Sequence, residues 1–332
     1  MASIRQQIKT LHEKGMIIDD ESVVRKILLD ENYYNVINAY KDLFLDGTYH
    51  QQNINDPDEK YLNNVNFNEL FSMFKFDRSL RELFFNYFLI VENQFKTHVA
   101  FEFSHKYKNK GIEAYLNYNN YDCGPKNENK ANVLDLIGGI CETIKLNQKH
   151  DIIKHFLDTN QPIPIWALVS FFEMGKIKKF YINCDSHIRY NIAQKYYKIQ
   201  DSELKSFIET INMFRNVCAH DNRLYCYRIK DFQKQISDMP VHRNMNLTTM
   251  STKNGSIFTL GKNDLFACVI ALKYLLSDKL FSEFCQTLNN IILKLSSKLK
   301  SISVDKVLKK MGFLLANQSG QFDWHEIINI SK

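Results

Sequence analysis

The chain has 332 residues, of which 45% are hydrophobic and 24% charged, and its 43 Lys and Arg against 37 Asp and Glu give a formal net charge of +6. These values exclude an intrinsically disordered, collagen-like or low-complexity protein, and the length suffices for a hydrophobic core without disulfides or metal ions. Because the chain contains only 11 Gly and 5 Pro, the sequence favours an all-α fold over a β architecture with many turns.

The first 50 residues predict a small helical unit. Apolar residues from Ile4 to Leu11 repeat at helical spacing and stop at Gly15, a typical C-cap residue. Asp20 then has the side chain of an N-cap and predicts the start of a second helix. The unit, over residues 1–50, resembles a helix-turn-helix, but no basic recognition helix stands out in it, so we expect no DNA binding.

The longest periodic segment runs from Phe67 to about Lys106 and keeps close to a 3.6-residue period. It opens a helical domain predicted over 67–300. Further helices are predicted at 131–148, 151–158, 164–182, 186–198, 201–226, 263–277 and 279–300. Residues 237–262 read as a loop with room for a small hairpin. Short helices at 303–311 and 323–330 would form a C-terminal unit over 301–332.

The seven cysteines form no C-x-x-C pair, which indicates reduced thiols and no zinc site. No apolar stretch is long enough to span a bilayer, and the N-terminal residues lack the apolar core of a signal peptide. We therefore expect a soluble, cytoplasmic protein with no membrane partner. No metal or other cofactor is expected.

The segment predicted as a helix at 201–226 contains the residues with side chains suited to catalysis. At 100° per residue, His220 and Arg223 both fall within about 40° of Asn216, with Arg215 about 100° from Asn216. Histidine exchanges protons near neutral pH, and guanidinium groups match phosphate oxygens. This set suits metal-independent RNA cleavage, with the RNA 2′-OH as the nucleophile. The same stripe is also compatible with a salt-bridged helix terminus, or with phosphate binding without chemistry.

The motif contains a single histidine, His220, which leaves one of two proton transfers without a group, because cleavage needs both a general base and a general acid. Two copies facing each other across a two-fold axis would supply two histidines and four arginines. We therefore predict a homodimer with a composite site.

Residues 215–224, RNVCAHDNRL, resemble the R-N-x-C-A-H-x-x-R-L signature of the Abi-like (AbiD/AbiF) abortive-infection proteins, which belong to the HEPN superfamily. Two more segments resemble the family in the same order: residues 76–81, FDRSLR, followed by Glu92 and Lys96, and the run PIW at 164–166 followed by Gly175. The matches span about residues 5–226. The family usually has Arg at position 96, His at 221 and Trp at 225.

The resemblance implies an all-α, HEPN-type helical bundle, with the N-terminal unit and the C-terminal helices added to it. In this bundle the helix at 67–106 packs near the motif helix. Arg215, Asn216 and His220 would be catalytic, supported by Arg223 and by Glu92, which would pair with Arg215 or His220. By spacing alone Glu92 is equally suited to pair with Lys96, one turn later. The family also implies a growth-arresting endoribonuclease toxin of phage defence, restrained by a noncoding antitoxin RNA.

RNA is thus the expected partner, and the mild positive charge is compatible with it. The candidate RNA-binding cations are Arg78, Arg81, Lys96, Lys176, Lys178 and Lys179. Phe180 and Tyr181, beside the last three, could stack a base, although lysines near a helix end also complement the helix dipole. Lysines between 294 and 310 form a second basic surface, equally compatible with RNA binding and with simple solvation.

Overall fold

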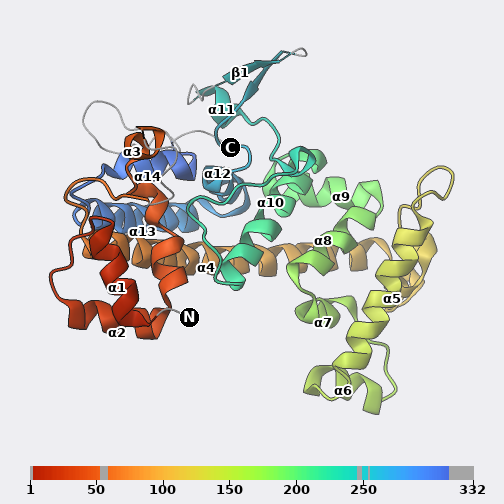
Figure 1. Ribbon diagram of the computed structural model, residues 1–332. Helices are drawn as coiled ribbons and strands as arrows, with labels where there is room; N and C mark the ends of the chain where they lie inside the picture. Colours follow the sequence, from red (N-terminus) through yellow and green to blue (C-terminus); the bar gives the residue numbers. More distant parts are fainter. Residues whose placement is uncertain (1–2, 53–58, 245–248, 253–254, 314–332) are drawn as a thin grey trace.

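The computed structural model describes residues 3–52, 59–244, 249–252 and 255–313, which are helical apart from turns, loops and one small hairpin. The longest element is α4 (Phe67–Lys106), which runs through the molecule while the other helices are arranged along it (Figure 1). Its 40 residues correspond to about 60 Å of helix. Asn66 caps its first turn by accepting a hydrogen bond from the backbone N–H of Asn68. The predicted bounds of this helix are confirmed.

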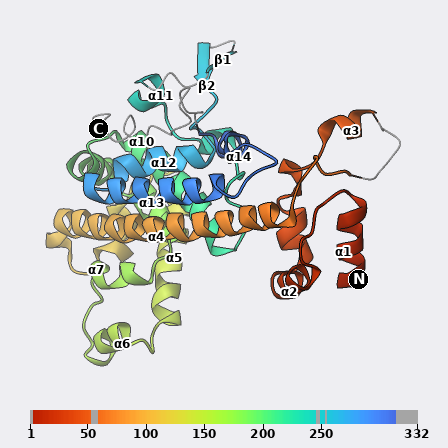
Figure 2. The same cartoon turned by 90° about the vertical axis from the view of Figure 1, so that its left-hand side faces the viewer.

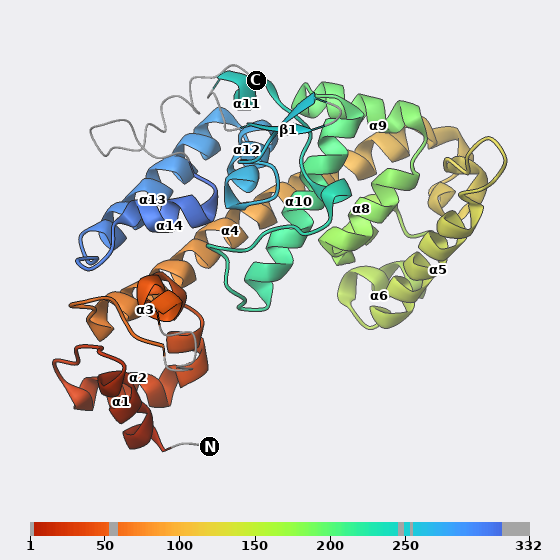
Figure 3. The same cartoon turned by 45° about the horizontal axis from the view of Figure 1, so that its top comes forward.

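The N-terminal unit gathers at one end of α4 (Figure 3). It contains α1 (Ile4–Glu13), α2 (Glu21–Glu31), a π-helical turn (Tyr34–Asn38), a 3-10 turn (Lys41–Leu43) and α3 (Gly47–Gln52). Both predicted caps are confirmed. Gly15 has φ +89°, and the Asp20 carboxylate accepts hydrogen bonds from the backbone N–H groups of Ser22 and Val23.

The helices in the middle of the chain lie along the half of α4 that is away from the N-terminal unit (Figure 1). Its helices are α5 (Lys130–Leu146), α6 (Asp151–Asp158), α7 (Ile165–Leu168), α8 (Met174–Asn183), α9 (Ser186–Ile192) and α10 (Asp201–Ala219). Short 3-10 turns lie at Lys108–Lys110, Ala114–Leu116, Tyr118–Asn120 and Val169–Phe171, and a π-helical turn at Ala193–Tyr197 extends α9. α5, α6 and α7 lie at the end of α4 away from the N-terminal unit.

The prediction of one helix over 164–182 is wrong. The backbone is extended at Phe172, between α7 and α8. In an uninterrupted helix Ile177 would lie about 180° from Leu168, because nine residues turn the helix two and a half times. The break lets Leu168, Phe172 and Ile177 all enter the core, where each is almost fully buried.

The C-terminal part contains a 3-10 turn (Phe232–Lys234), α11 (Pro240–Asn244), strands β1 (Thr249–Thr252) and β2 (Gly255–Phe258), α12 (Leu265–Leu275), α13 (Asp278–Ser296) and α14 (Val304–Met311). The strands form an antiparallel hairpin, as the loop composition allowed. α12 is apolar around its circumference and packs against α10, and α13 runs along α4 (Figure 2). The helix predicted at 323–330 lies outside the described residues.

One continuous hydrophobic core contains residues from all three predicted units, among them Leu28, Phe88 and Leu308. The division at 1–50, 67–300 and 301–332 stays a prediction. Among the described helices, none combines the length and the hydropathy needed to cross a membrane.

Two glycines that end helices offer a matched test of close packing. Gly15 and Gly312 both have positive φ, so alanine costs about 1–2 kcal/mol of strain at either position. A Cβ at Gly15 would meet no atom within 4 Å, whereas at Gly312 it would lie 2.1 Å from the Asp264 carboxyl carbon. Asp264 is fully buried and held by hydrogen bonds, so it cannot move away freely.

We expect Gly312→Ala to lower the free energy of unfolding by clearly more than Gly15→Ala, as measured by urea denaturation. Equal losses in the two variants would contradict the tight packing of Gly312 against Asp264.

Candidate functional site

The motif lies at the carboxyl end of α10. The apolar side of this helix packs against α4 and α12 through Phe207, Ile211 and Phe214, all fully buried. α10 ends at Ala219, and His220 is its C-cap. The helix thereby carries Arg215 and Asn216 in its last turns and presents His220 where the chain leaves it.

The turn after the helix has the hydrogen bonds of a Schellman motif. The backbone N–H of Asn222 donates to the carbonyl of Val217 at 3.1 Å, and that of Asp221 to the carbonyl of Cys218 at 3.3 Å. Asp221 adopts the left-handed conformation, with φ +54°. Asparagine and aspartate tolerate this conformation better than other non-glycine residues, which explains why the helix can stop here without glycine.

The prediction that the helix continues to 226 is therefore wrong, and with it the placement of Arg223 on the helical face of Asn216. The reason is the left-handed residue at 221, which reverses the chain. Arg223 instead follows the turn, and its guanidinium donates to the carbonyl of Ala39 at 2.5 Å. Asn216 and His220 remain one helical turn apart, joined by the hydrogen bond from the His220 N–H to the Asn216 carbonyl.

A buried carboxylate on α4 fixes the chain beyond the turn. Asp77 is fully buried and accepts hydrogen bonds from the backbone N–H of Tyr225 at 2.7 Å and of Leu224 at 3.2 Å. It also accepts from the hydroxyl of Tyr40 at 2.8 Å and from Arg81 at 2.7 Å. Four donors from three separate segments thus converge on one side chain, which joins the N-terminal unit, α4 and the motif.

Arg81 and Arg78 extend this junction in two directions. Arg81 also contacts the exposed Asp221 carboxylate at 2.6 Å, which ties the left-handed residue to α4. Arg78 forms a two-pronged pair with Glu31 of α2, at 2.8 and 2.7 Å. Bidentate pairs fix orientation as well as distance, so α2 is held in one position against α4.

Glu92 lies between two cations, one on its own helix and one on α10. Its Oε1 contacts the Nζ of Lys96 at 2.6 Å, and its Oε2 lies 3.5 Å from the Nε of Arg215. The guanidinium of Arg215 also lies over the ring of Phe85, 5.6 Å from its centroid. Of the partners suggested by the sequence, Lys96 and Arg215 therefore contact Glu92, whereas no such contact with His220 is found among the described residues. The contact with Arg215 is confirmed, and the supporting role of Glu92 stays a prediction.

The three predicted catalytic residues differ in exposure. The side chain of Arg215 is 21% exposed, whereas Asn216 and His220 are exposed to solvent. Within the described ranges, no side-chain hydrogen bond or ion pair holds Asn216 or His220. An imidazole and an amide thus face solvent at the end of α10 that also carries Arg215, whose guanidinium contacts Glu92 and Phe85 of α4.

Cys218 lies within the motif but is not available as a nucleophile. Burial raises the pKa of its thiol to about 12, so the thiol stays protonated at neutral pH. In the part of the chain that the structure describes, no group of three or more His, Cys, Asp or Glu side chains could hold a metal ion.

The six predicted RNA-binding cations all have intramolecular contacts. Besides the arginines and Lys96 described above, Lys176 donates to the carbonyl of Gly139, Lys178 contacts Glu209 and Lys179 contacts Asp135. Arg81 and Lys96 are buried. RNA binding by these six residues stays a prediction, and any such contact would compete with an existing one.

The two aromatic residues beside Lys179 cannot stack a base, because Phe180 and Tyr181 are fully buried in the core. Trp166 is instead an exposed aromatic side chain, with 65% of its surface accessible. Sequence reasoning also missed the roles of Asp77 and Tyr40. Asp77 belongs to the FDRSLR segment, and apart from Arg81 of the same segment its donors lie 37 and 147 or more residues away in the chain.

Arg81 contacts two carboxylates, those of Asp77 and Asp221, and replacing each in turn gives a matched test of the junction. Asp77→Asn removes the fully buried carboxylate that accepts from four donors and leaves the buried Arg81 with only the exposed Asp221 among its described ion-pair partners, which costs about 3–5 kcal/mol of unfolding free energy. The Asp221 side chain is 70% exposed, so Asp221→Asn should cost no more than about 1 kcal/mol. Chemical denaturation measures both, and similar losses would contradict the central role of Asp77.

Comparison with known proteins gives one match. A family model described as "Abi-like protein" matches residues 26–226, a range that includes α4, α10 and the turn held by Asp77. No curated protein and no solved structure matches the chain. The model covers more than half of the sequence and ends just after the motif. This chain belongs to the Abi-like protein family.

Proposed function

We propose that the protein is a metal-independent endoribonuclease of the HEPN type, acting as a toxin in abortive infection. The observation that carries this proposal is the arrangement at the end of α10. An exposed imidazole and an exposed amide, neither with a side-chain partner among the described residues, lie at the same end of α10 as an arginine that contacts Glu92 and Phe85. Exposed polar groups beside a fixed cation suit binding and cleavage of a phosphodiester.

The proposed reaction uses the 2′-OH of the RNA as the nucleophile. His220 removes the proton of this hydroxyl as its oxygen attacks the adjacent phosphorus, while the bond to the 5′-oxygen of the next nucleotide breaks. Protonation of that oxygen completes cleavage and leaves a cyclic phosphate. Arg215 stabilises the negative charge that builds on the phosphoryl oxygens, and Asn216 donates a hydrogen bond to the imidazole or to a phosphoryl oxygen.

One histidine cannot serve as base and acid in the same turnover without first exchanging its proton. A homodimer with the two α10 ends facing each other would supply a second imidazole. The exposure of His220 and Asn216 is compatible with a partner chain at this end of the helix. In such a dimer, Arg223 would support the site from the turn.

Membership of the Abi-like family supports a role in abortive infection. In this role the toxin would be held inactive by a noncoding antitoxin RNA until infection. The alternative is a HEPN module that binds RNA through the same residues without cleaving it. A wild-type protein that binds RNA and never cleaves it would support this alternative.

Replacing the histidine tests the chemistry. We expect His220→Ala to lower the rate of RNA cleavage by about 100- to 10,000-fold, because a positioned proton-transfer group contributes that much. The readout is cleavage of a labelled RNA on a denaturing gel. His187→Ala, which removes an exposed histidine on α9, is the control and should cleave at the wild-type rate. Cleavage by His220→Ala at the wild-type rate would refute the proposal.

Mixed dimers test the composite site. We expect a dimer of one wild-type chain and one His220→Ala chain, purified through two different affinity tags, to have far less than half of the wild-type activity. The reason is that its shared site lacks one of two proton-transfer groups. Half of the wild-type activity would instead indicate two independent sites, and a monomer in sedimentation analysis would contradict the dimer itself.

A further inference from the structure

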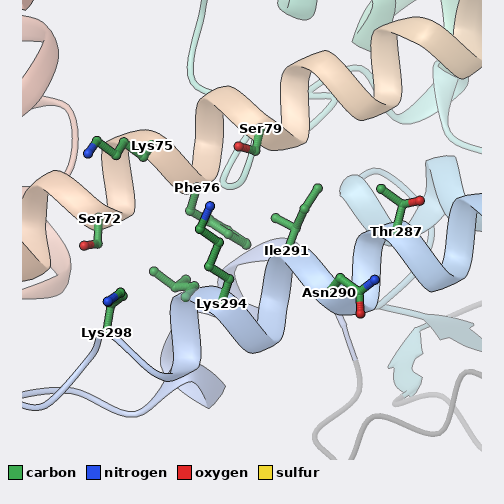
Figure 4. A pocket seen from close by; sticks show the side chains of 10 residues that line it. Ser72, Lys75, Phe76, Ser79, Thr287, Asn290, Ile291, Lys294 and Lys298 are labelled. Carbon is green, nitrogen blue, oxygen red and sulfur yellow. The ribbon is translucent and has the colours of Figure 1, made fainter.

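A pocket between α4 and α13 lies apart from the motif. It has a volume of about 360 Å³ and is lined by Ser72, Lys75, Phe76, Ser79, Thr287, Asn290, Ile291, Lys294, Leu295 and Lys298 (Figure 4). The residues from α4 are spaced three and four apart, and so are those from α13. Two helical stripes therefore face each other across a groove, with buried Phe76 and Leu295 below it.

The groove carries positive charge that no lining carboxylate offsets. Its three lysines, Lys75, Lys294 and Lys298, are exposed, and no described carboxylate lies within ion-pair distance of them. Lys75 lies over the ring of Phe71, 4.4 Å from its centroid, and has no hydrogen-bond acceptor among the described residues. In Figure 4 Lys294 reaches from α13 towards α4 beside Phe76. This contrasts with the paired cations Arg78, Arg81 and Lys96 described above.

Hydroxyl and amide groups continue the groove beyond the lysines. Thr287 and Asn290 lie at the end away from Lys75 and Lys298, and Ser79 lines the groove from α4 (Figure 4). Side chains of these kinds bind the phosphates and sugars of nucleic acids. The side chains that could bind a ligand are therefore spread along the groove and not gathered around one point.

The dimensions of the groove favour a single strand of nucleic acid over a small anion as its ligand. The stripe from Thr287 to Leu295 is about 12 Å long, which is longer than a single phosphate group. The lining residues lie in or just beyond regular helix, so their backbone N–H groups are occupied and form no phosphate-binding nest. Three separated lysines without such a nest suit the backbone of a polymer.

The groove and the motif lie on opposite sides of α4. Ser79 lines the groove and Arg81 contacts the motif turn, and two residues separate side chains by about 200° around a helix. An RNA held in the groove therefore need not enter the site at the end of α10.

We propose that the groove between α4 and α13 binds the phosphodiester backbone of single-stranded RNA, through Lys75, Lys294 and Lys298, as a second RNA site distinct from the cleavage site. The choice of RNA among polyanions rests on the proposed function. Binding there is independent of base sequence, because the groove offers cations and hydroxyls for the backbone.

The test compares two triple variants with the same change in charge. The first is Lys75→Gln/Lys294→Gln/Lys298→Gln. The control is Lys26→Gln/Lys145→Gln/Lys149→Gln, which removes three exposed lysines that the structure places in no described contact. Both are made with and without His220→Ala, and circular dichroism verifies their fold. Binding of a fluorescein-labelled oligouridylate to the His220→Ala forms is followed by anisotropy over a range of KCl concentrations.

We expect the groove variant to bind this RNA, and a labelled oligoadenylate, about tenfold or more weakly than the control. The slope of log Kd against log salt should fall by about 2, since three phosphate contacts are lost at about 0.7 each. Equal affinities and slopes in the two variants would overturn the proposal. So would weaker binding of a polyglutamate probe with unchanged RNA binding, which would assign the groove to an acidic protein partner.

The cleavage assay separates this proposal from the proposed function. RNA binding that depends on the groove, in a wild-type protein that cleaves nothing, supports the groove and contradicts the nuclease. Cleavage with an affinity that is insensitive to the groove lysines overturns the groove alone.

Discussion

The arrangement of the site depends on one buried carboxylate, Asp77. A charge in the core is stable only when donors surround it, and Asp77 has donors from Arg81, Tyr40 and the backbone of residues 224 and 225. Because these donors come from the N-terminal unit, α4 and the segment after α10, the cost of burying the charge is offset only when all three are assembled. The turn that presents His220 is thereby coupled to the packing of the whole N-terminal half.

Helices with a regular apolar pattern and clear caps could be predicted from the sequence. The bounds of α4, the stop at Gly15 and the cap at Asp20 are examples, because the signals that set them lie within a few residues. The ends of α7 and α10 could not be placed from the apolar pattern alone. At Phe172 the core requires a break that no local residue signals, whereas at Asp221 the Asp-Asn pair was a usable turn signal.

The motif identified the residues of the candidate site but not the geometry that holds them. Arg215 and Glu92 meet because α4 and α10 pack together, and only the family resemblance placed these helices side by side. Asp77 had no assigned role, because apart from Arg81 its partners are far away in the chain. The pairing of charged side chains could not be predicted from the sequence either. A sequence does not distinguish a lysine paired with a carboxylate, such as Lys178, from one without an ion-pair partner among the described residues, such as Lys294.

The hydrogen bonds from Leu224 and Tyr225 to Asp77 have a consequence for how the site can be observed. Both amides lie outside regular secondary structure, where deuterium exchange is ordinarily fast, yet both residues are buried and donate to a buried carboxylate. Their exchange requires the turn to detach from α4. The exchange rates of these two amides therefore measure, in the intact protein, how often the turn that presents His220 detaches from α4.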